Sequence, residues 1–144
     1  MNYVMCSHLH GDHYGWNTRL KDGKWVPTFP NARYLISRGE YEFWRNDIES
    51  GTAHPMRKQP WTESMLPIIE HGLATFVEGT YGFEKEMPDE VRYMPLHGHT
   101  KHHCGLYIRH GPKDAIFPGD GIEHAIQLAR PDIVGAMTPR PQPR

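Results

Sequence analysis

The chain has 144 residues, 38% of them hydrophobic, which fits one domain with a modest core. Its 16 basic and 17 acidic residues give a formal net charge of -1, so the charge favours neither nucleic acid nor an anionic membrane as a partner, and we expect a small-molecule substrate. The sequence shows no apolar leader, and none of its apolar runs approaches the roughly 20 residues of a membrane helix. Its only cysteines, Cys6 and Cys104, are interpreted as free thiols. These features predict a cytoplasmic protein.

Strands and helices alternate in the first half of the chain. Residues 3–6 are a β-prone apolar run that ends in a polar loop rich in histidine, and residues 32–36 show the next strand pattern. Ser37 is the expected N-cap of a helix over about residues 38–47, whose aromatic residues group on one face. Thr62 is the expected N-cap of a second helix.

The second half of the chain contains short runs that favour strands. These runs are residues 75–77, 91–94, 106–108 and 115–117. The turn sequence that begins at Gly111 joins the last two runs in a predicted hairpin. Residues 133–144 are rich in proline and are predicted to be disordered. We therefore expect a single α+β domain over residues 1–132.

The chain contains 11 histidines, and most of them lie in two segments. In the first segment, His8, His10 and His13 accompany the carboxylate of Asp12. Imidazole nitrogen and carboxylate oxygen are ligands that zinc accepts, as do iron, manganese and cobalt to a lesser extent. Residues two apart project to the same side of an extended segment, so His8 and His10 can share one ion. Gly11 lets the loop bend tightly, which directs Asp12 and His13 toward a second ion. The alternative is a solvated loop that is merely rich in histidine.

Three motifs in order resemble those of the metallo-β-lactamase superfamily, in particular its lactonase-like bacterial hydrolases. They are the HxHxDH pattern at residues 8–13, the segment Gly98-His99-Thr100 and the segment Pro118-Gly119-Asp120. The resemblance extends from Tyr3 to about Asp132 and implies a partial αββα sandwich with a dinuclear zinc site at one edge. It implies a first ion bound by His8, His10 and His99, a second ion bound by Asp12 and His13, and a bridge between the ions formed by Asp120.

The leading hypothesis is a metal-dependent hydrolase that uses a zinc-bound hydroxide on a small ester or lactone, with Asp12 and Asp120 as the catalytic carboxylates. The relatives also cleave β-lactams, thioesters, phosphotriesters and nucleic acids, so the resemblance leaves the substrate open. His10 argues for hydrolysis, since oxygen-reducing relatives usually carry glutamate at this position. An iron-dependent dioxygenase relative and a non-catalytic metal-binding fragment of such an enzyme are the alternatives.

Several assignments have structural alternatives. His99 can instead be a histidine bonded to backbone, and Asp120, which lies between two glycines, can be a turn residue. We expect His103 to lie next to the metal ligands without binding the metal, and His124 to lie at the rim of the site. The histidines without partners in the sequence are expected at the surface: His54, His71 and His110. The aromatic residues in and after the metal loop form either a wall for the substrate or part of the core: Tyr14, Trp16, Trp25, Phe29, Tyr41 and Trp44.

Two features depart from the pattern of the relatives. Few residues precede His8, where the relatives carry several strands, and residues 133–144 contain no histidine, where the relatives contribute a last ligand to the second metal. We therefore expect strands to be missing from the first sheet and the second metal to bind weakly. The chain is interpreted as a fragment of a protein about twice as long, and a short variant completed as a homodimer is the alternative.

Overall fold

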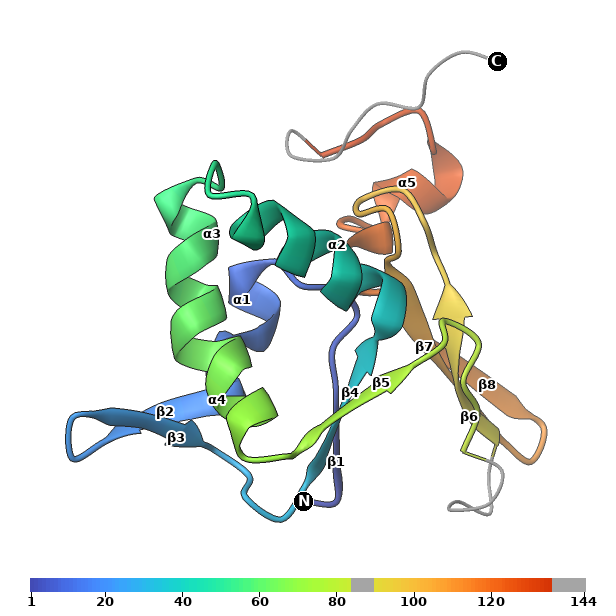
Figure 1. Ribbon diagram of the computed structural model, residues 1–144. Helices are drawn as coiled ribbons and strands as arrows, with labels where there is room; N and C mark the ends of the chain where they lie inside the picture. Colours follow the sequence, from blue (N-terminus) through green and yellow to red (C-terminus); the bar gives the residue numbers. More distant parts are fainter. Residues whose placement is uncertain (84–89, 136–144) are drawn as a thin grey trace. The chain divides into compact units, whose positions relative to one another are not determined.

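The computed structural model describes residues 1–83 and 90–135 (Figure 1). The chain divides into two compact units, Met1–Val77 and Glu78–Arg144. The extent of the domain, expected from the sequence as residues 1–132, stays a prediction. Among the described residues, no helix is both long enough and apolar enough to cross a membrane.

A parallel three-stranded sheet forms the base of the first unit. It consists of β1 (Tyr3–Met5), β4 (Arg33–Ser37) and β5 (Ala74–Val77), in the order β1-β4-β5. The central strand is buried along residues 34–37, and this burial explains its continuous apolar run, because a central strand of a parallel sheet is covered on both faces. The strands predicted over residues 3–6, 32–36 and 75–77 are confirmed.

Two helices of this unit lie in segments for which the sequence predicted a structure: the histidine-rich loop and the residues after β4. The helix α2 (Arg38–Glu49) confirms the predicted helix. Ser37 occupies the N-cap position, as predicted, although its side chain makes no hydrogen bond to the helix. The helix α1 (Gly11–Tyr14) forms where a loop was expected, and a 3-10 helix over Gly15–Asn17 follows it.

A longer helical segment contains three parts in direct succession: α3 (Pro55–Pro60), a π-helical turn (Trp61–Met65) and α4 (Leu66–Glu70). It begins after His54, whose Nδ1 accepts a hydrogen bond from the Met56 N–H at 3.2 Å. The prediction that this helix begins at Thr62 is therefore wrong, because Thr62 lies inside the segment and donates its hydroxyl to the Lys58 carbonyl. The better signal is Pro55, since proline is favoured in the first turn, where its missing N–H is not needed.

The π-helical turn has a cause in the sequence. Pro60 and Pro67 have no N–H to donate to the carbonyls four residues earlier in the chain. Between them, the Leu66 N–H donates to the carbonyl of Trp61, five residues earlier. The widened turn keeps Trp61 and Met65 buried on the inner face of the segment.

The helices pack over the sheet through an apolar cluster. Its buried members are Cys6, Leu9, Tyr14, Ile36, Trp44, Trp61 and Met65. A second cluster joins Ala32 and Tyr34 of the sheet region to Ile68 of α4. In Figure 1, α1 lies between α2 and the α3–α4 segment. Since Leu9 and Tyr14 both belong to the first cluster, the histidine loop is anchored in the core at two points.

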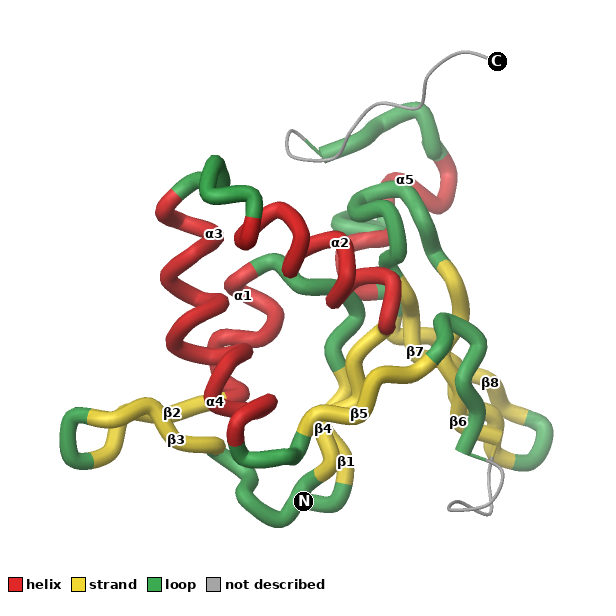
Figure 2. Tube along the Cα trace, viewed as in Figure 1, coloured by secondary structure: helices red, strands yellow, loops and turns green. Residues whose placement is uncertain are grey.

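A β-hairpin projects from the first unit (Figure 2). Its strands are β2 (Thr18–Lys21) and β3 (Lys24–Pro27), joined at Asp22 and Gly23, which have φ angles of 50° and 75°. This pair of positive φ angles suits a two-residue hairpin turn. The sequence did not predict these strands, because their polar and apolar residues do not alternate.

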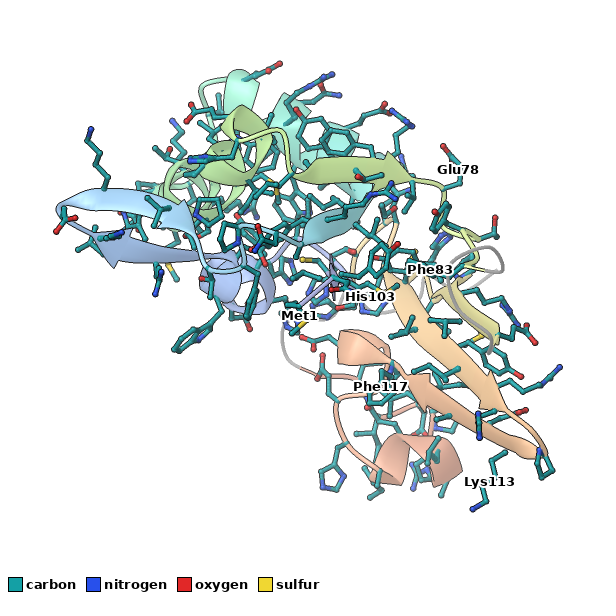
Figure 3. All side chains as sticks on the ribbon, turned by 90° about the horizontal axis from the view of Figure 1, so that it is seen from below. Met1, Glu78, Phe83, His103, Lys113 and Phe117 are labelled. Carbon is teal, nitrogen blue, oxygen red and sulfur yellow. The ribbon has the colours of Figure 1, made fainter. Side chains whose placement is uncertain are left out.

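An antiparallel three-stranded sheet forms the centre of the second unit. Its strands are β6 (Glu90–Pro95), β7 (Cys104–His110) and β8 (Lys113–Phe117), in the order β6-β7-β8. They confirm the predicted strands and the predicted hairpin, which turns at Gly111 with a φ of 56°. Figure 3 labels Lys113 and Phe117 at the two ends of β8, and His103 just before β7.

The chain continues after β8 with little regular structure. A 3-10 helix covers Gly119–Gly121, and the short helix α5 covers Ile126–Ala129. Residues 133–135 of the predicted tail have no regular secondary structure, and residues 136–144 lie outside the described residues.

Candidate metal centre

The first unit gathers three imidazole rings at the carboxyl end of β1. The Nε2 atom of His8 lies 3.1 Å from the Nδ1 atom of His10. The rings of His8 and His13 have centroids 4.1 Å apart. His8 is buried, and its other ring nitrogen is 3.1 Å from the Ser7 hydroxyl. The structure therefore brings together the three histidines that the sequence assigned to metal binding in this segment.

Asp12 and His13 occupy the short helix α1, where a tightly bent loop was expected. The Oδ2 atom of Asp12 lies 3.5 Å from the Nε2 atom of His13, and the Asp12 side chain is 80% exposed. Although a helix rotates successive residues by about 100° about its axis, the ends of these two side chains approach each other. The predicted assignment of both residues to a second ion stays a prediction.

Gly11 is needed for a reason other than the one expected. Its φ angle is not positive, so the glycine is not required for a tight bend. A Cβ atom built on Gly11 would lie 2.7 Å from the Cγ atom of Pro60, on α3. Glycine at this position therefore lets α3 approach the metal loop closely.

Two buried groups near the histidine loop, the Cys6 thiol and the Tyr14 hydroxyl, have raised pKa values. Burial raises the pKa of the Cys6 thiol to about 11, although the Asn17 amide, which donates to the sulfur at 3.7 Å, opposes this shift. Burial also raises the pKa of Tyr14, and the nearby Cys6 thiolate adds to the shift.

Neither Cys6 nor Cys104 forms a disulfide within the described residues, which confirms the prediction of thiols for both cysteines.

The second unit brings His99 and Asp120 together. The Nε2 atom of His99 lies 3.5 Å from the Oδ2 atom of Asp120. Gly98 and Gly119, which directly precede them, have φ angles of 155° and 53°, values that other residues rarely adopt. Both residues line a cavity of about 310 Å³, together with His97 and several apolar side chains.

The structure adds Glu123 to this group, and the sequence analysis did not identify it. The Oε1 atom of Glu123 lies 3.5 Å from the Nδ1 atom of His99, on the ring nitrogen opposite Asp120. A carboxylate on the second nitrogen of a metal-binding histidine orients the ring and raises its basicity. The spacing of three residues from Asp120 to Glu123 is the only signal in the sequence, and it is too common to be specific.

The remaining histidines divide by exposure. His103 is completely buried, and its ring centroid is 6.1 Å from that of His99. His124 is exposed, and its Nδ1 accepts a hydrogen bond from the Ile126 N–H at 3.1 Å. The three histidines expected at the surface are exposed, which confirms that prediction: His54, His71 and His110.

The aromatic residues in and after the metal loop were expected to form either a wall for the substrate or part of the core, and Tyr14 and Trp44 belong to the buried core cluster. Tyr14 and Trp44 line a pocket of about 40 Å³ beside His10, and Trp61, which the sequence analysis did not include, lines it too. Trp16 is 85% exposed. The other three aromatic residues named from the sequence are not part of the pocket lining: Trp25, Phe29 and Tyr41. Tyr41 and Phe29 instead pack against the two buried clusters of the first unit.

A comparison with protein-family models decides the family. The model described as the metallo-beta-lactamase superfamily matches residues 2–142. The chain belongs to this superfamily. The resemblance inferred from the three motifs is therefore confirmed. No curated protein matches the chain significantly.

Solved structures of metallo-beta-lactamase-fold proteins are similar to the chain in fold. The hydrolase AbOPH matches at 20% identity with a TM-score of 0.76, and the match covers 96% of this chain and 47% of that one. A protein described as a probable metal-dependent hydrolase from Staphylococcus aureus matches at 17% identity and a TM-score of 0.68, over 97% of this chain and 45% of that one. The dizinc quorum-quenching lactonase AidC matches at 22% identity and a TM-score of 0.55, over 81% of this chain and 40% of that one.

These matches confirm the predicted fold class, a mixed α and β fold that corresponds to part of the αββα sandwich. The chain spans about half the length of the first solved structures that it matches.

Proposed function

We propose that this chain carries the metal-binding core of a hydrolase that cleaves small esters, and lactones in particular, with zinc as its metal. His8, His10 and His99 would hold the first ion, Asp12 and His13 would hold the second, and Asp120 would be a ligand of both. The observation that carries the proposal is the close approach of the ring nitrogens of His8 and His10, with His13 beside them.

The donor atoms of the first unit fit a zinc ion. Two imidazole nitrogens that bind one tetrahedral zinc at about 2.0–2.1 Å lie about 3.3 Å from each other. The nitrogens of His8 and His10 are 3.1 Å apart, close to this separation. Nitrogen and oxygen donors without a cysteine thiolate also suit manganese, iron and cobalt, so zinc is the part of the proposal that metal analysis must test.

The ligands have different tasks in the proposed reaction. When bound, the metal ions lower the pKa of a water molecule and polarise the carbonyl oxygen of the ester. Glu123 faces the Nδ1 atom of His99 and orients its ring, which leaves the Nε2 atom, on the side of Asp120, to bind a metal. Asp12 is exposed, so its carboxylate can accept the proton that the attacking water gives up and pass it to the alkoxide oxygen of the leaving group.

The proposed substrate class is inferred first from the pocket beside His10. Leu9, Tyr14, Trp44 and Trp61 line this pocket, whose volume of about 40 Å³ suits a small apolar group. The near-neutral charge of the chain favours an uncharged substrate over nucleic acid. The solved structure of AidC, a lactonase with a dizinc site in complex with its product, is compatible with this choice.

The test is hydrolysis by the purified chain of a panel of lactones and aryl esters, before and after zinc loading. His10→Ala and His110→Ala form a matched pair, since each removes one imidazole and only the first lies in the proposed site. We expect zinc-dependent turnover in the wild type and in His110→Ala, and loss of turnover and of tight zinc binding in His10→Ala.

Three results would contradict the proposal. Tight zinc binding without turnover of any ester would indicate a non-catalytic metal-binding chain. Iron as the bound metal, with oxygen consumption, would indicate a dioxygenase. Equal loss of zinc in both variants would show that the histidines act as a nonspecific chelating surface.

A further inference from the structure

The helix α2 carries a buried carboxyl group that faces the histidine loop. Glu40 lies in the first turn of this helix and is completely buried. Its Oε2 atom accepts a hydrogen bond from the backbone N–H of Leu9 at 3.1 Å. The same oxygen accepts a hydrogen bond from the indole N–H of Trp44 at 2.8 Å. Leu9 lies between His8 and His10, so Glu40 holds the backbone of the metal loop at its centre.

Packing alone does not explain a carboxyl group at this position. Transfer of a charged or strongly polar group into the interior is unfavourable unless hydrogen bonds replace its hydration. An apolar residue would fill the same space on the inner face of α2 without that penalty. The hydrogen bonds from Leu9 and Trp44 help to offset the burial of Glu40, and both donors are in groups that support His10.

Trp44 supplies the second of these connections. Its ring packs edge-on against the ring of His10, with centroids 5.3 Å apart. The indole is itself almost completely buried, and its N–H is held by Glu40. Glu40 therefore restrains His10 both through the loop backbone and through the indole ring.

We propose that Glu40 is a positioning residue for metal binding, because it holds Leu9 and Trp44 so that the ring nitrogens of His8 and His10 stay directed at a common point. The nitrogens are 3.1 Å apart. Without an ion, one of these nitrogens can donate a hydrogen bond to the other. To bind zinc, both nitrogens must be unprotonated and direct their lone pairs at one point, and an external restraint on the loop favours that arrangement. The inference rests on the proposed function only in that His8 and His10 bind a metal.

The experiment measures zinc affinity, by competition with a chromophoric chelator, and the visible spectrum of the cobalt-substituted chain. Glu40→Leu removes the acceptor oxygens, Glu40→Gln keeps one, and Ile68→Ala is a structural control in the other buried cluster of the same unit. We expect Glu40→Leu to weaken zinc binding by about 10 to 100-fold, the effect typical for loss of a group that orients a ligand, and to shift the cobalt bands.

Ile68→Ala should lower thermal stability but leave the cobalt bands in place and change zinc affinity by less than about threefold. Glu40→Gln should bind zinc more tightly than Glu40→Leu, because its amide oxygen can still accept the two hydrogen bonds. Should Glu40→Leu fail to fold, Glu40→Asp carries the same expectation of weaker binding, since its carboxylate is one methylene short of both donors.

The proposal is overturned if Glu40→Leu, or Glu40→Asp in its place, binds zinc as the wild type does. It is also overturned if Ile68→Ala weakens zinc binding as much as the Glu40 variant does, or if Glu40→Gln is no better than Glu40→Leu. Because the readout is metal binding, absence of ester hydrolysis in the wild type contradicts the proposed function and leaves this test intact.

Discussion

Replacement of Gly11 by alanine tests whether the metal loop and α3 are in close contact. The new Cβ would lie 2.7 Å from the Cγ atom and 3.0 Å from the Cβ atom of Pro60. Favourable contacts between carbon atoms are about 3.5–4.0 Å long, so either the loop or α3 must move. Pro60 has no rotamer that removes the clash, because its ring is closed on the backbone.

The magnitude of the effect follows from two opposing contributions. Insertion of a methyl group into a packed contact costs about 1–3 kcal/mol of unfolding free energy. Alanine in place of glycine at a helical position recovers about 0.4–1 kcal/mol through the unfolded state. We therefore expect Gly11→Ala to lower the unfolding free energy by about 1–2 kcal/mol, and Tm by about 3 °C for each kcal/mol.

Gly15→Ala is the matched control. Gly15 has helical φ and ψ angles of -55° and -34°, and a Cβ atom built on it meets nothing within 4 Å. We expect this variant to raise the unfolding free energy by about 0.4–1 kcal/mol. Thermal unfolding followed by circular dichroism, on metal-free protein, measures both variants. Equal stabilisation by the two alanines would refute the reasoning, because it would mean that Pro60 does not restrict the loop.

Three further predictions concern the core, the thiols and the metal content. Ile68→Ala should lower the unfolding free energy by about 2–5 kcal/mol in denaturant titrations, whereas Ile126→Ala, at an exposed position, should change it by less than about 0.5 kcal/mol. Cys6 and Cys104 are both buried, so neither should react with a colorimetric thiol reagent at neutral pH until the chain is denatured, and rapid reaction of either would contradict the burial. Mass spectrometry after dialysis should find nearer one zinc ion than two per chain, because the proposed second ion has one imidazole ligand, the exposed carboxylate of Asp12 and only a share of Asp120. Two firmly held ions would contradict this expectation.

The sequence was sufficient for most of the strands and for the candidate metal ligands of the histidine loop. The strand patterns at residues 32–36 and 106–108 are short apolar runs, and the structure forms β4 and β7 at these places. The metal-binding residue types at positions 8–13 could be recognised because their density has no other common cause. These features depend on local sequence, so a single chain reveals them.

The features that the sequence did not reveal depend on contacts between distant residues. The role of Gly11 comes from Pro60, which is far from it in the chain, and no local pattern indicates their contact. Glu40 could have been noticed as an acidic residue on the apolar face of α2, four positions before Trp44, but its hydrogen bond to Leu9 crosses 31 positions. The start of α3 was missed because threonine is a common N-cap residue and Thr62 was taken for one. The proline that marks the first turn of this helix, Pro55, was not used as a signal.

The central claim is the proposal that His8, His10 and His99 bind one zinc ion, and X-ray absorption at the zinc edge tests it most directly. With one equivalent of zinc, the spectrum of the wild type should fit about three imidazole ligands at about 2.0–2.1 Å. His99→Ala should reduce this number to about two, whereas His97→Ala, in the same segment but exposed, should leave it at about three. An unchanged imidazole count in His99→Ala would contradict the account, since zinc would then be bound by the histidine loop of the first unit alone.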